Sequence, residues 1–256
     1  MKQVLSIVIT VIILFFSCSK RSVPGTGAVA AFNVVNAVVG SNPTVVVAFS
    51  QSNIIYAAWG DISYGASNVF SPEAGSVPLT LARISDTTEP FLRGTLTLNA
   101  GSVYSLFISG DTTTIDTLLT QDIIPYYPST DSVMGIRFVN LSSGSNPISI
   151  NLEGSSMGSE VGNLPYKGIT GFKQYANNST TIDYLFVVRD AATGDSLTQF
   201  DFRASGSGNK GFGLTDPSSN QNNGVLLTFK NVTIAVYGSE GISSSNPLST
   251  MLIDNY

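Results

Sequence analysis

The sequence predicts an all-β protein with two tandem antiparallel β-sandwich domains, of immunoglobulin-like or transthyretin-like type. Short apolar segments, several with two-residue alternation, recur between clusters of Gly, Pro, Asp, Ser and Asn, as strands and their turns do. Long segments with helical periodicity and capping residues are absent. Motifs of the first half return about a hundred residues later, a length typical of one self-sufficient sandwich domain.

The N-terminus predicts export. After Lys2, residues 4–16 form an apolar run of 13 residues, which is too short for a membrane-spanning helix of roughly 20 residues. Such a run is typical of a secretory signal peptide. It ends in LFFSCSK, and a small residue followed by cysteine resembles the bacterial lipobox. By this resemblance, cleavage between Ser17 and Cys18 leaves the only cysteine of the chain to carry lipid.

A lipid on Cys18 predicts that the membrane is a partner of the mature chain, which is tethered to it and does not span it. Ser19 follows the cysteine where inner-membrane lipoproteins have Asp, so the resemblance favours the outer membrane. Lys20 and Arg21 come next, which favours the periplasmic face and leaves the cell surface open. An ordinary secretory signal with a stray thiol and an uncleaved anchor are the alternatives.

The remaining chain divides at a proline-containing junction, DIIPYYPSTD. The expected parts are a signal peptide at 1–17, a tether at 18–27, a first sandwich at 28–128, a linker at 129–132 and a second sandwich at 133–256. Strands are expected in the first sandwich at 31–38, 44–49, 77–84, 94–98, 103–108 and 115–120. Strands are expected in the second at 134–141, 147–152, 181–190, 197–202, 210–214, 224–229 and 232–237. About seven strands would complete each sandwich.

The two halves share a repeat. The tetrapeptide GSNP occurs at 40–43 and at 144–147, each time after a Val-Asn pair. Gly, Asn and Pro favour tight turns, so both copies are predicted to turn the first hairpin of their domain. Three further pairs, with offsets of 102, 102 and 106, are Tyr64 with Tyr166, Phe70 with Phe172, and Arg83 with Arg189.

The segments IRFVNLSSGSNPISINL and VGNLPYKGITGF resemble the family known as domain of unknown function 4397. The match is weaker in the first half, where residues 37–39 replace the polar turn and 62–65 lack the proline. The resemblance implies a Bacteroidetes-type lipoprotein with two tandem copies of the domain. It brings no catalytic residue with it.

Composition excludes several kinds of chemistry. The chain has no histidine, which excludes nucleophile systems with an imidazole base and the usual zinc sites. Asp111, Asp116 and Asp122 lack the dense oxygen spacing of a calcium loop and are interpreted as residues of solvated turns. No catalytic residue, metal or cofactor is predicted, and the protein is not expected to be an enzyme.

The charge balance argues against nucleic acid as a partner. Removing residues 1–17 removes one Lys and no acid, so 11 basic and 17 acidic residues give a net charge of −6. Nucleic-acid binding instead requires clustered basic side chains.

Aromatic residues near predicted strand ends are the candidate ligand surface, namely Trp59, Tyr126 and Tyr127. Packing inside or between the domains is the alternative for each. The expected function is a non-enzymatic envelope lipoprotein with an interaction surface for a protein or glycan partner. A carbohydrate-binding lipoprotein of a glycan-uptake system is the first alternative. A fimbria-like structural or adhesion subunit, with its C-terminal segment 246–256 as an exchanged strand, is the second.

Overall fold

The computed structural model describes residues 27–40, 44–50, 60–128, 130–177, 183–203, 231–240 and 246–255. Cys18, Trp59 and the expected strands at 210–214 and 224–229 lie outside these ranges. The described residues form strands and turns, which confirms the all-β fold class. Among them there is no helix of the length and apolarity needed to cross a bilayer.

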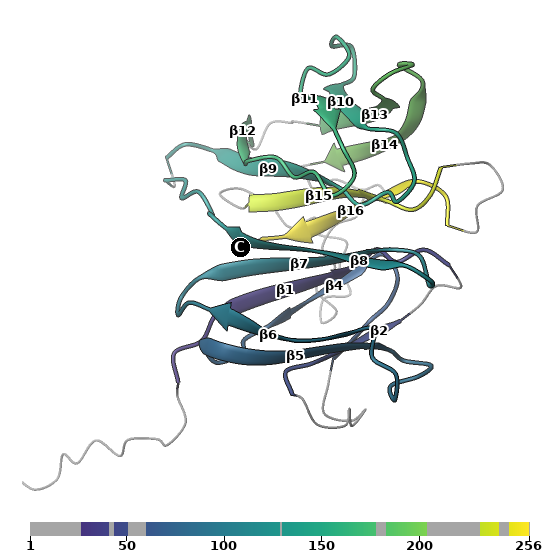
Figure 1. The fold of residues 1–256 in the computed structure, drawn as a ribbon. Helices are drawn as coiled ribbons and strands as arrows, with labels where there is room; N and C mark the ends of the chain where they lie inside the picture. Colours follow the sequence, from purple (N-terminus) through teal and green to yellow (C-terminus); the bar gives the residue numbers. More distant parts are fainter. Residues whose placement is uncertain are drawn as a thin grey trace, which may run out of the picture.

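In the first sandwich, the described residues form eight strands in two four-stranded sheets (Figure 1). The strands are β1 (Ala31–Asn36), β2 (Val45–Ala48), β3 (Gly60–Ile62), β4 (Ala66–Phe70), β5 (Gly75–Arg83), β6 (Leu92–Leu98), β7 (Val103–Gly110) and β8 (Ile115–Asp122). One sheet has the order β4-β1-β7-β8 and the other β3-β2-β5-β6.

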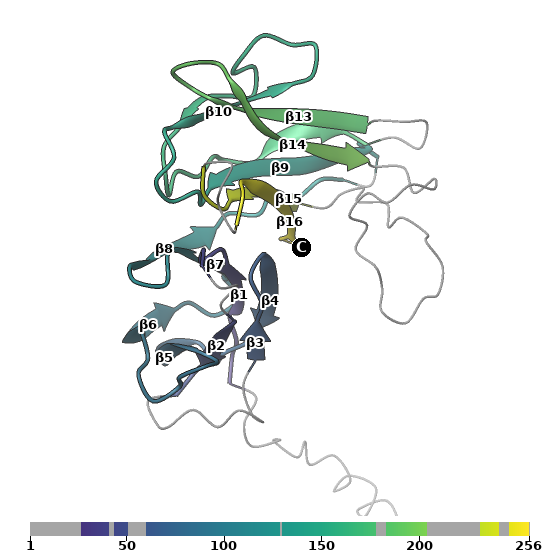
Figure 2. The ribbon, with the colours of Figure 1, turned by 90° about the vertical axis from the view of Figure 1, so that its right-hand side faces the viewer.

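The second sandwich repeats this plan. Its strands are β9 (Val133–Asn140), β10 (Ile148–Leu152), β11 (Val161–Leu164), β12 (Lys173–Ala176), β13 (Asp183–Asp190), β14 (Ser196–Arg203), β15 (Asn231–Tyr237) and β16 (Ser249–Asp254). The sheet orders, β12-β9-β15-β16 and β11-β10-β13-β14, are those of the first sandwich with every strand number raised by eight. Figure 2 shows the second sandwich stacked on the first.

Among the described strands, each sandwich has one parallel pair beside its antiparallel ones, β1 with β7 and β9 with β15. The immunoglobulin constant type places its first two strands in one sheet. Here β1 and β2 lie in opposite sheets, as do β9 and β10. The described strands therefore depart from the immunoglobulin order. Of the two predicted types, the transthyretin-like one remains.

Both GSNP copies stand in the chain between strands of opposite sheets, so the predicted hairpin role is wrong. Residues 41–43 of the first copy lie outside the described ranges. Both segments lie between strands that never pair with each other, β1 and β2 or β9 and β10. Two-residue alternation gives a strand one buried face but does not say which sheet the strand joins. The asparagine that precedes each GSNP copy, Asn36 or Asn140, makes the same contact in both sandwiches. The Asn36 side-chain nitrogen donates to the carbonyl oxygen of Ile62 at 2.9 Å. The Asn140 side-chain nitrogen donates to the carbonyl oxygen of Leu164 at 3.0 Å.

Strand register tests the other predicted equivalences. Arg83 pairs with Val45 and Arg189 with Ser149, at matching positions of the repeat, so this equivalence is confirmed. Phe70 and Phe172 are not equivalent. The partner of β1 at Phe32 is Phe70, whereas the matching position of β9, Ile136, pairs with Lys173. A shift of one residue turns a side chain to the other face of the sheet.

Each sandwich encloses its own core between its two sheets. The first core includes Phe32, Leu79 and Ile108, and the second includes Ile136, Ile148 and Phe186. These side chains come from the apolar positions of the alternating strands, as sheet geometry requires. A third buried cluster lies between the sandwiches and belongs to the junction.

Candidate functional site: the junction between the sandwiches

The two tyrosines of the predicted ligand surface have opposite environments. Tyr126 is 87% exposed, and Tyr127 is 6% exposed. A Cβ added to Gly135 of β9 would lie 2.7 Å from the Tyr127 hydroxyl, so the tyrosine is packed against bare backbone. Burial raises the Tyr127 pKa above its usual value. Tyr127 therefore attaches the connecting segment to the second sandwich, and only Tyr126 of this pair is available to a partner.

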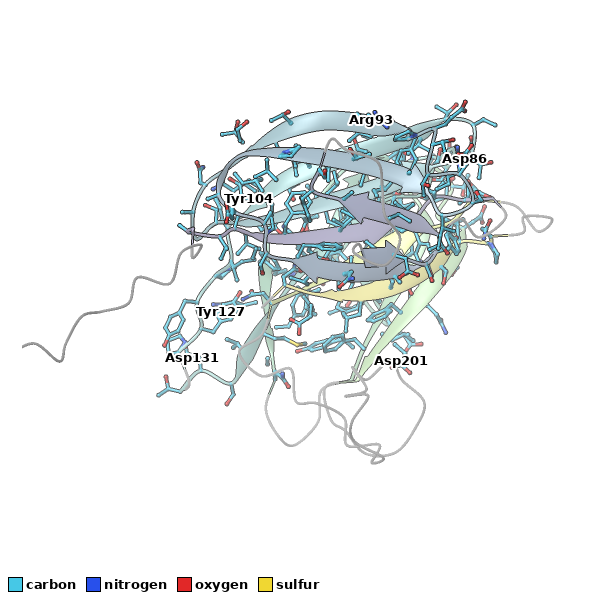
Figure 3. The ribbon with its side chains drawn as sticks, turned by 90° about the horizontal axis from the view of Figure 1, so that it is seen from below. Asp86, Arg93, Tyr104, Tyr127, Asp131 and Asp201 are labelled. Atoms are coloured by element: carbon cyan, nitrogen blue, oxygen red, sulfur yellow. The ribbon has the colours of Figure 1, made fainter. Side chains whose placement is uncertain are left out.

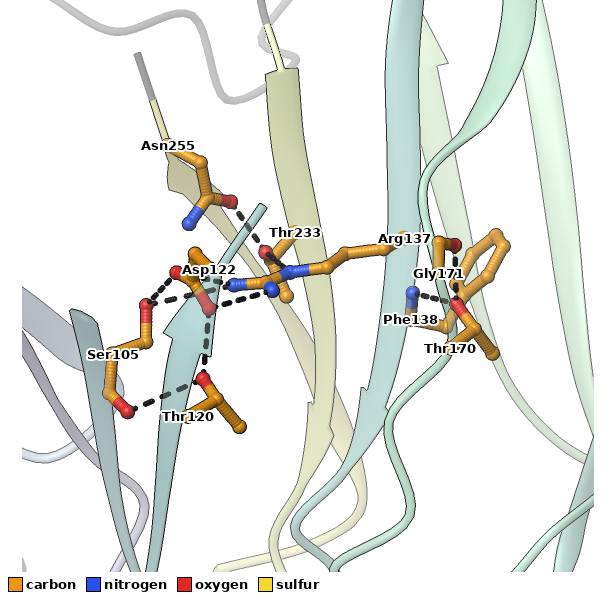
Figure 4. Close-up of polar contacts among 9 residues, drawn as sticks. All are labelled: Ser105, Thr120, Asp122, Arg137, Phe138, Thr170, Gly171, Thr233 and Asn255. Carbon is orange, nitrogen blue, oxygen red and sulfur yellow. Dashed lines mark hydrogen bonds and ion pairs between the residues drawn. The ribbon is translucent and has the colours of Figure 1, made fainter. Parts of the chain in front are cut away.

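A buried ion pair joins the end of β8 to the middle of β9 (Figure 4). Arg137 donates from both terminal nitrogens to the two carboxylate oxygens of Asp122, each at 2.8 Å. Their side chains are 6% and 0% exposed. A bidentate geometry of this kind is the strongest form of the arginine–carboxylate contact. The interpretation of Asp122 as a solvated turn residue is wrong, because Asp122 lies at the closed interface of two sandwiches.

Neighbouring side chains complete the coordination of this ion pair. Ser105 and Thr120 donate hydroxyl protons to the Asp122 carboxylate at 2.6 and 2.8 Å. Arg137 Nε donates to Thr233 Oγ1 at 2.7 Å, and the Phe172 ring centroid lies 4.7 Å from its guanidinium carbon. Desolvating two charges is costly unless such partners replace the lost water. The site is therefore built to hold the sandwiches together.

The network follows the internal repeat and departs from it at one position. The parallel registers make Ser105 equivalent to Thr233, and Asp122 occupies the place of Asn255. The hydroxyl of Thr233 donates to Asn255 as that of Ser105 donates to Asp122. Asn33, by contrast, stands where the second sandwich has Arg137, so the cation is present on one side only.

A second pair of contacts crosses the junction reciprocally. Tyr64 of the first sandwich packs against Tyr237 of the second, with ring centroids 5.2 Å apart. Its repeat equivalent Tyr166 contacts Ser109 of the first sandwich, with hydroxyl oxygens 2.8 Å apart. Ser109 is in turn the equivalent of Tyr237 by register. Burial, with Tyr237 alongside, raises the Tyr64 pKa to about 12.

The apolar part of the junction is made by the same faces. Val35 and Ala37 are equivalent in the repeat to Val139 and Leu141, and all four are fully buried in one cluster. Its other buried members are Phe107, Ala235, Met251 and Ile253. Equivalent surfaces that contact each other in this way form an interface of the kind found in symmetric dimers.

The remaining predicted acids lie in surface structures. Asp111 is a turn residue whose carboxylate accepts hydrogen bonds from the Thr113 hydroxyl and from the backbone N–H groups of Thr114 and Thr113, and these bonds lower its pKa. Asp116 pairs with Lys167 at 3.3 Å and accepts a hydrogen bond from Tyr166 at 3.1 Å. Within the described ranges, no three side chains of the metal-binding types come together.

A third polar cluster lies away from the junction, around Glu160 at the start of β11. Its carboxylate is 4% exposed, lies 2.7 Å from the Lys173 ammonium and accepts the Tyr175 hydroxyl proton. Burial pushes the Glu160 pKa upward, but the bonds from Lys173 and Tyr175 outweigh burial and leave the pKa below its usual value. Burial and the bond to Glu160 raise the Tyr175 pKa.

Sequence reasoning missed Arg137 and Ile123. A signal for Arg137 was present, since it is the one charged residue of the apolar strand segment MGIRFVNL, and a buried guanidinium requires a carboxylate partner. Ile123 is 88% exposed although its neighbour Asp122 is buried. No periodic pattern crosses this strand end, so composition alone does not distinguish the two environments.

Comparison with known proteins gives no family. No family model matches the chain, and no curated protein matches it. The solved structures that match the chain include three with TM-scores of 0.27, 0.24 and 0.21.

The first of these structures is the C-terminal domain of AlgF from P. aeruginosa, 19% identical over 37% of this chain and 98% of that one. The second is a family CBM26 module of Amy13K from Eubacterium rectale in complex with maltoheptaose, 9% identical over 89% and 97%. The third is a candidate adhesin from Bacteroides ovatus, 12% identical over 93% and 96%. At these TM-scores the likenesses carry no functional conclusion.

Proposed function

We propose that the protein is a non-enzymatic lipoprotein of the cell envelope that presents a two-sandwich body to a partner. The observation that supports this most is that the charges of the Arg137–Asp122 ion pair are buried and fully hydrogen-bonded. The two charges pair with each other, and Ser105, Thr120 and Thr233 supply their remaining hydrogen bonds. A site of this kind positions two domains and leaves binding to the exposed surface.

The anchor of this protein is the lipid on Cys18, in the outer membrane, with the periplasmic face as the default. The support is in the sequence, where the apolar run and Cys18 precede the first described residue, Gly27. Membership of the domain of unknown function 4397 family is part of the same proposal. The repeat that carries the resemblance is used twice, with the same sheet order in both halves.

Metabolic labelling tests the anchor. Cells that produce the full chain are grown with a radiolabelled fatty acid, beside cells that produce Cys18→Ala. The label is expected on the parent chain and absent from the variant. A label that stays on Cys18→Ala would refute the anchor, because it would show attachment elsewhere.

A glycan surface is the second candidate, and the exposure of Tyr126 favours it. An aromatic face held in water can stack on a sugar ring, and Trp59 is its predicted companion. Binding on a glycan array that is lost in both Trp59→Ala and Tyr126→Ala would support this candidate. No binding to any glycan by the parent chain would end it.

A fimbria-like role requires the C-terminal strand to be exchanged between copies. In this structure the segment is β16, paired with β15 along its length, with Met251 and Ile253 buried in the junction. Exchange would therefore open the interface between the sandwiches. A C-terminal deletion of residues 247–256 that leaves a stable monomer would count against this role.

A further inference from the structure

Two large apolar side chains project into water from a firmly held backbone. Ile123 is 88% exposed and Tyr126 is 87% exposed, on the segment that follows β8. Asp122 on one side is fixed by Arg137, and Tyr127 on the other side is buried. Between them, the Asn231 side chain donates to the carbonyl of Pro125 at 2.8 Å. The exposed pair is thus presented by a preorganised segment, which lowers the entropic cost of binding.

The exposed pair lies at the end of the molecule where the described part of the chain begins. Val103 pairs both with Ala31, at the start of β1, and with Asp122, at the end of β8. Figure 3 shows Tyr127 and Asp131 at the end where β1 starts. Val29, just before β1, is 48% exposed and adds a further apolar side chain at this end.

The chain length between Cys18 and this end is short. Residues 19–27 number nine, and nine residues span at most about 30 Å when fully extended. A lipid on Cys18 would therefore keep this end close to the bilayer surface at all times. Such a tether turns weak contacts into intramolecular ones with a high effective concentration.

We propose that Ile123 and Tyr126 insert into the headgroup region of the membrane that holds the chain. This rests on the proposed anchor at Cys18. Tyrosine at the membrane–water interface buries its ring while its hydroxyl stays hydrated, and isoleucine adds apolar area. Lys20 and Arg21 would lie at the headgroups, where they offset the acidic charge of the body. The protein then lies on the bilayer by the end that carries Ile123 and Tyr126. The loops at the other end of the sandwiches are directed away from the bilayer.

Fluorescence depth measurements test this contact in the full chain. Trp59, the only tryptophan, is replaced by Phe, and a single tryptophan is introduced as Tyr126→Trp or, for control, as Met157→Trp. Met157 is also a large exposed apolar residue, at 45%, and lies in the loop between β10 and β11. Both positions are exposed, so both variants should keep the melting temperature of the Trp59→Phe parent. Each variant is purified from membranes and reconstituted in zwitterionic vesicles with brominated lipid tails, where charge attraction contributes little.

The expected result is a blue-shifted, lipid-quenched emission from position 126 and an unquenched emission from position 157. Adding Ile123→Ser to the Tyr126→Trp variant should reduce the quenching. If the protein floats with the vesicles and position 126 stays unquenched, the docking inference is overturned while the anchor stands. If the protein does not float, the proposed anchor itself fails. Emission that shifts with added glycan but not with lipid would also overturn docking, in favour of the glycan candidate.

Discussion

A single side chain makes the two sides of the junction different. Asn33 and Arg137 occupy the same position of the repeat, and both are buried. The Asn33 side-chain oxygen finds no hydrogen-bond partner among the described residues, whereas Arg137 reaches Asp122 of the other sandwich. One arginine and one carboxylate at the interface therefore satisfy each other without a second copy of either.

Removing the arginine should leave a buried charge without its partner. Arg137→Met is expected to lower the free energy of unfolding by roughly 3–5 kcal/mol, since Asp122 stays desolvated. The double variant Arg137→Met/Asp122→Leu removes both charges and should recover most of the loss. Urea denaturation of the three proteins measures this. Equal stability of the parent and the single variant would contradict the structural role of the pair.

The reciprocal tyrosines give a matched pair of hydroxyl deletions. Tyr166→Phe should cost about 0.5–1.5 kcal/mol, because its hydroxyl contacts Ser109 and Asp116. Tyr64→Phe should cost nothing measurable, because the Tyr64 hydroxyl is buried without a hydrogen-bond partner among the described residues. Melting temperatures provide the comparison. The reverse order of effects would show that the two sides of the junction are assigned wrongly.

Glu160 predicts a pH dependence with a definite sign. Its pKa in the folded state is lowered from 4.5, so the carboxylate stabilises the fold above pH 4.5. That contribution should disappear as the pH falls from 4.5 through the folded-state pKa. Stability measured between neutral pH and pH 3 should therefore fall less steeply in Glu160→Gln than in the parent. Parallel curves would remove Glu160 from the acid response.

At the scale of elements, the sequence predicts those features of the fold that depend on local residue pattern. The strand segments and the repeat follow from alternation and turn residues, and the register confirms Arg83 with Arg189. Sheet membership depends on long-range pairing, which local pattern does not contain, so the hairpin predicted at GSNP is wrong. Neighbouring residues of an irregular segment can face opposite ways without any periodic pattern, so the sequence does not distinguish the exposed Tyr126 from the buried Tyr127.

The attachment of the connecting segment to β9 depends on the absence of a side chain. A Cβ at Gly135 would lie 2.1 Å from the Asn231 side-chain oxygen as well as close to Tyr127. Gly135→Ala should therefore cost about 1–3 kcal/mol through displacement of both groups. Gly162 of β11 is the control, since a Cβ there meets nothing within 4 Å. Thermal unfolding should show Gly162→Ala near the parent, and equal losses in both variants would contradict this packing.

At the scale of the whole molecule, the repeat explains the interface. Equivalent sheets of the two sandwiches face each other, and their tyrosine contacts are exchanged by the same relation that exchanges the sandwiches. A covalent link between two self-complementary domains gives a fixed body without disulfide bonds, which a chain with one cysteine could not form internally. Under the proposed lipid anchor, such a fixed body would present one face consistently.

The two sandwiches should behave as one body, and scanning calorimetry tests this most directly. If the junction holds as described, the protein unfolds in a single transition whose calorimetric and van't Hoff enthalpies agree. Two separate transitions in the parent protein, each with about half of the total enthalpy, would contradict it.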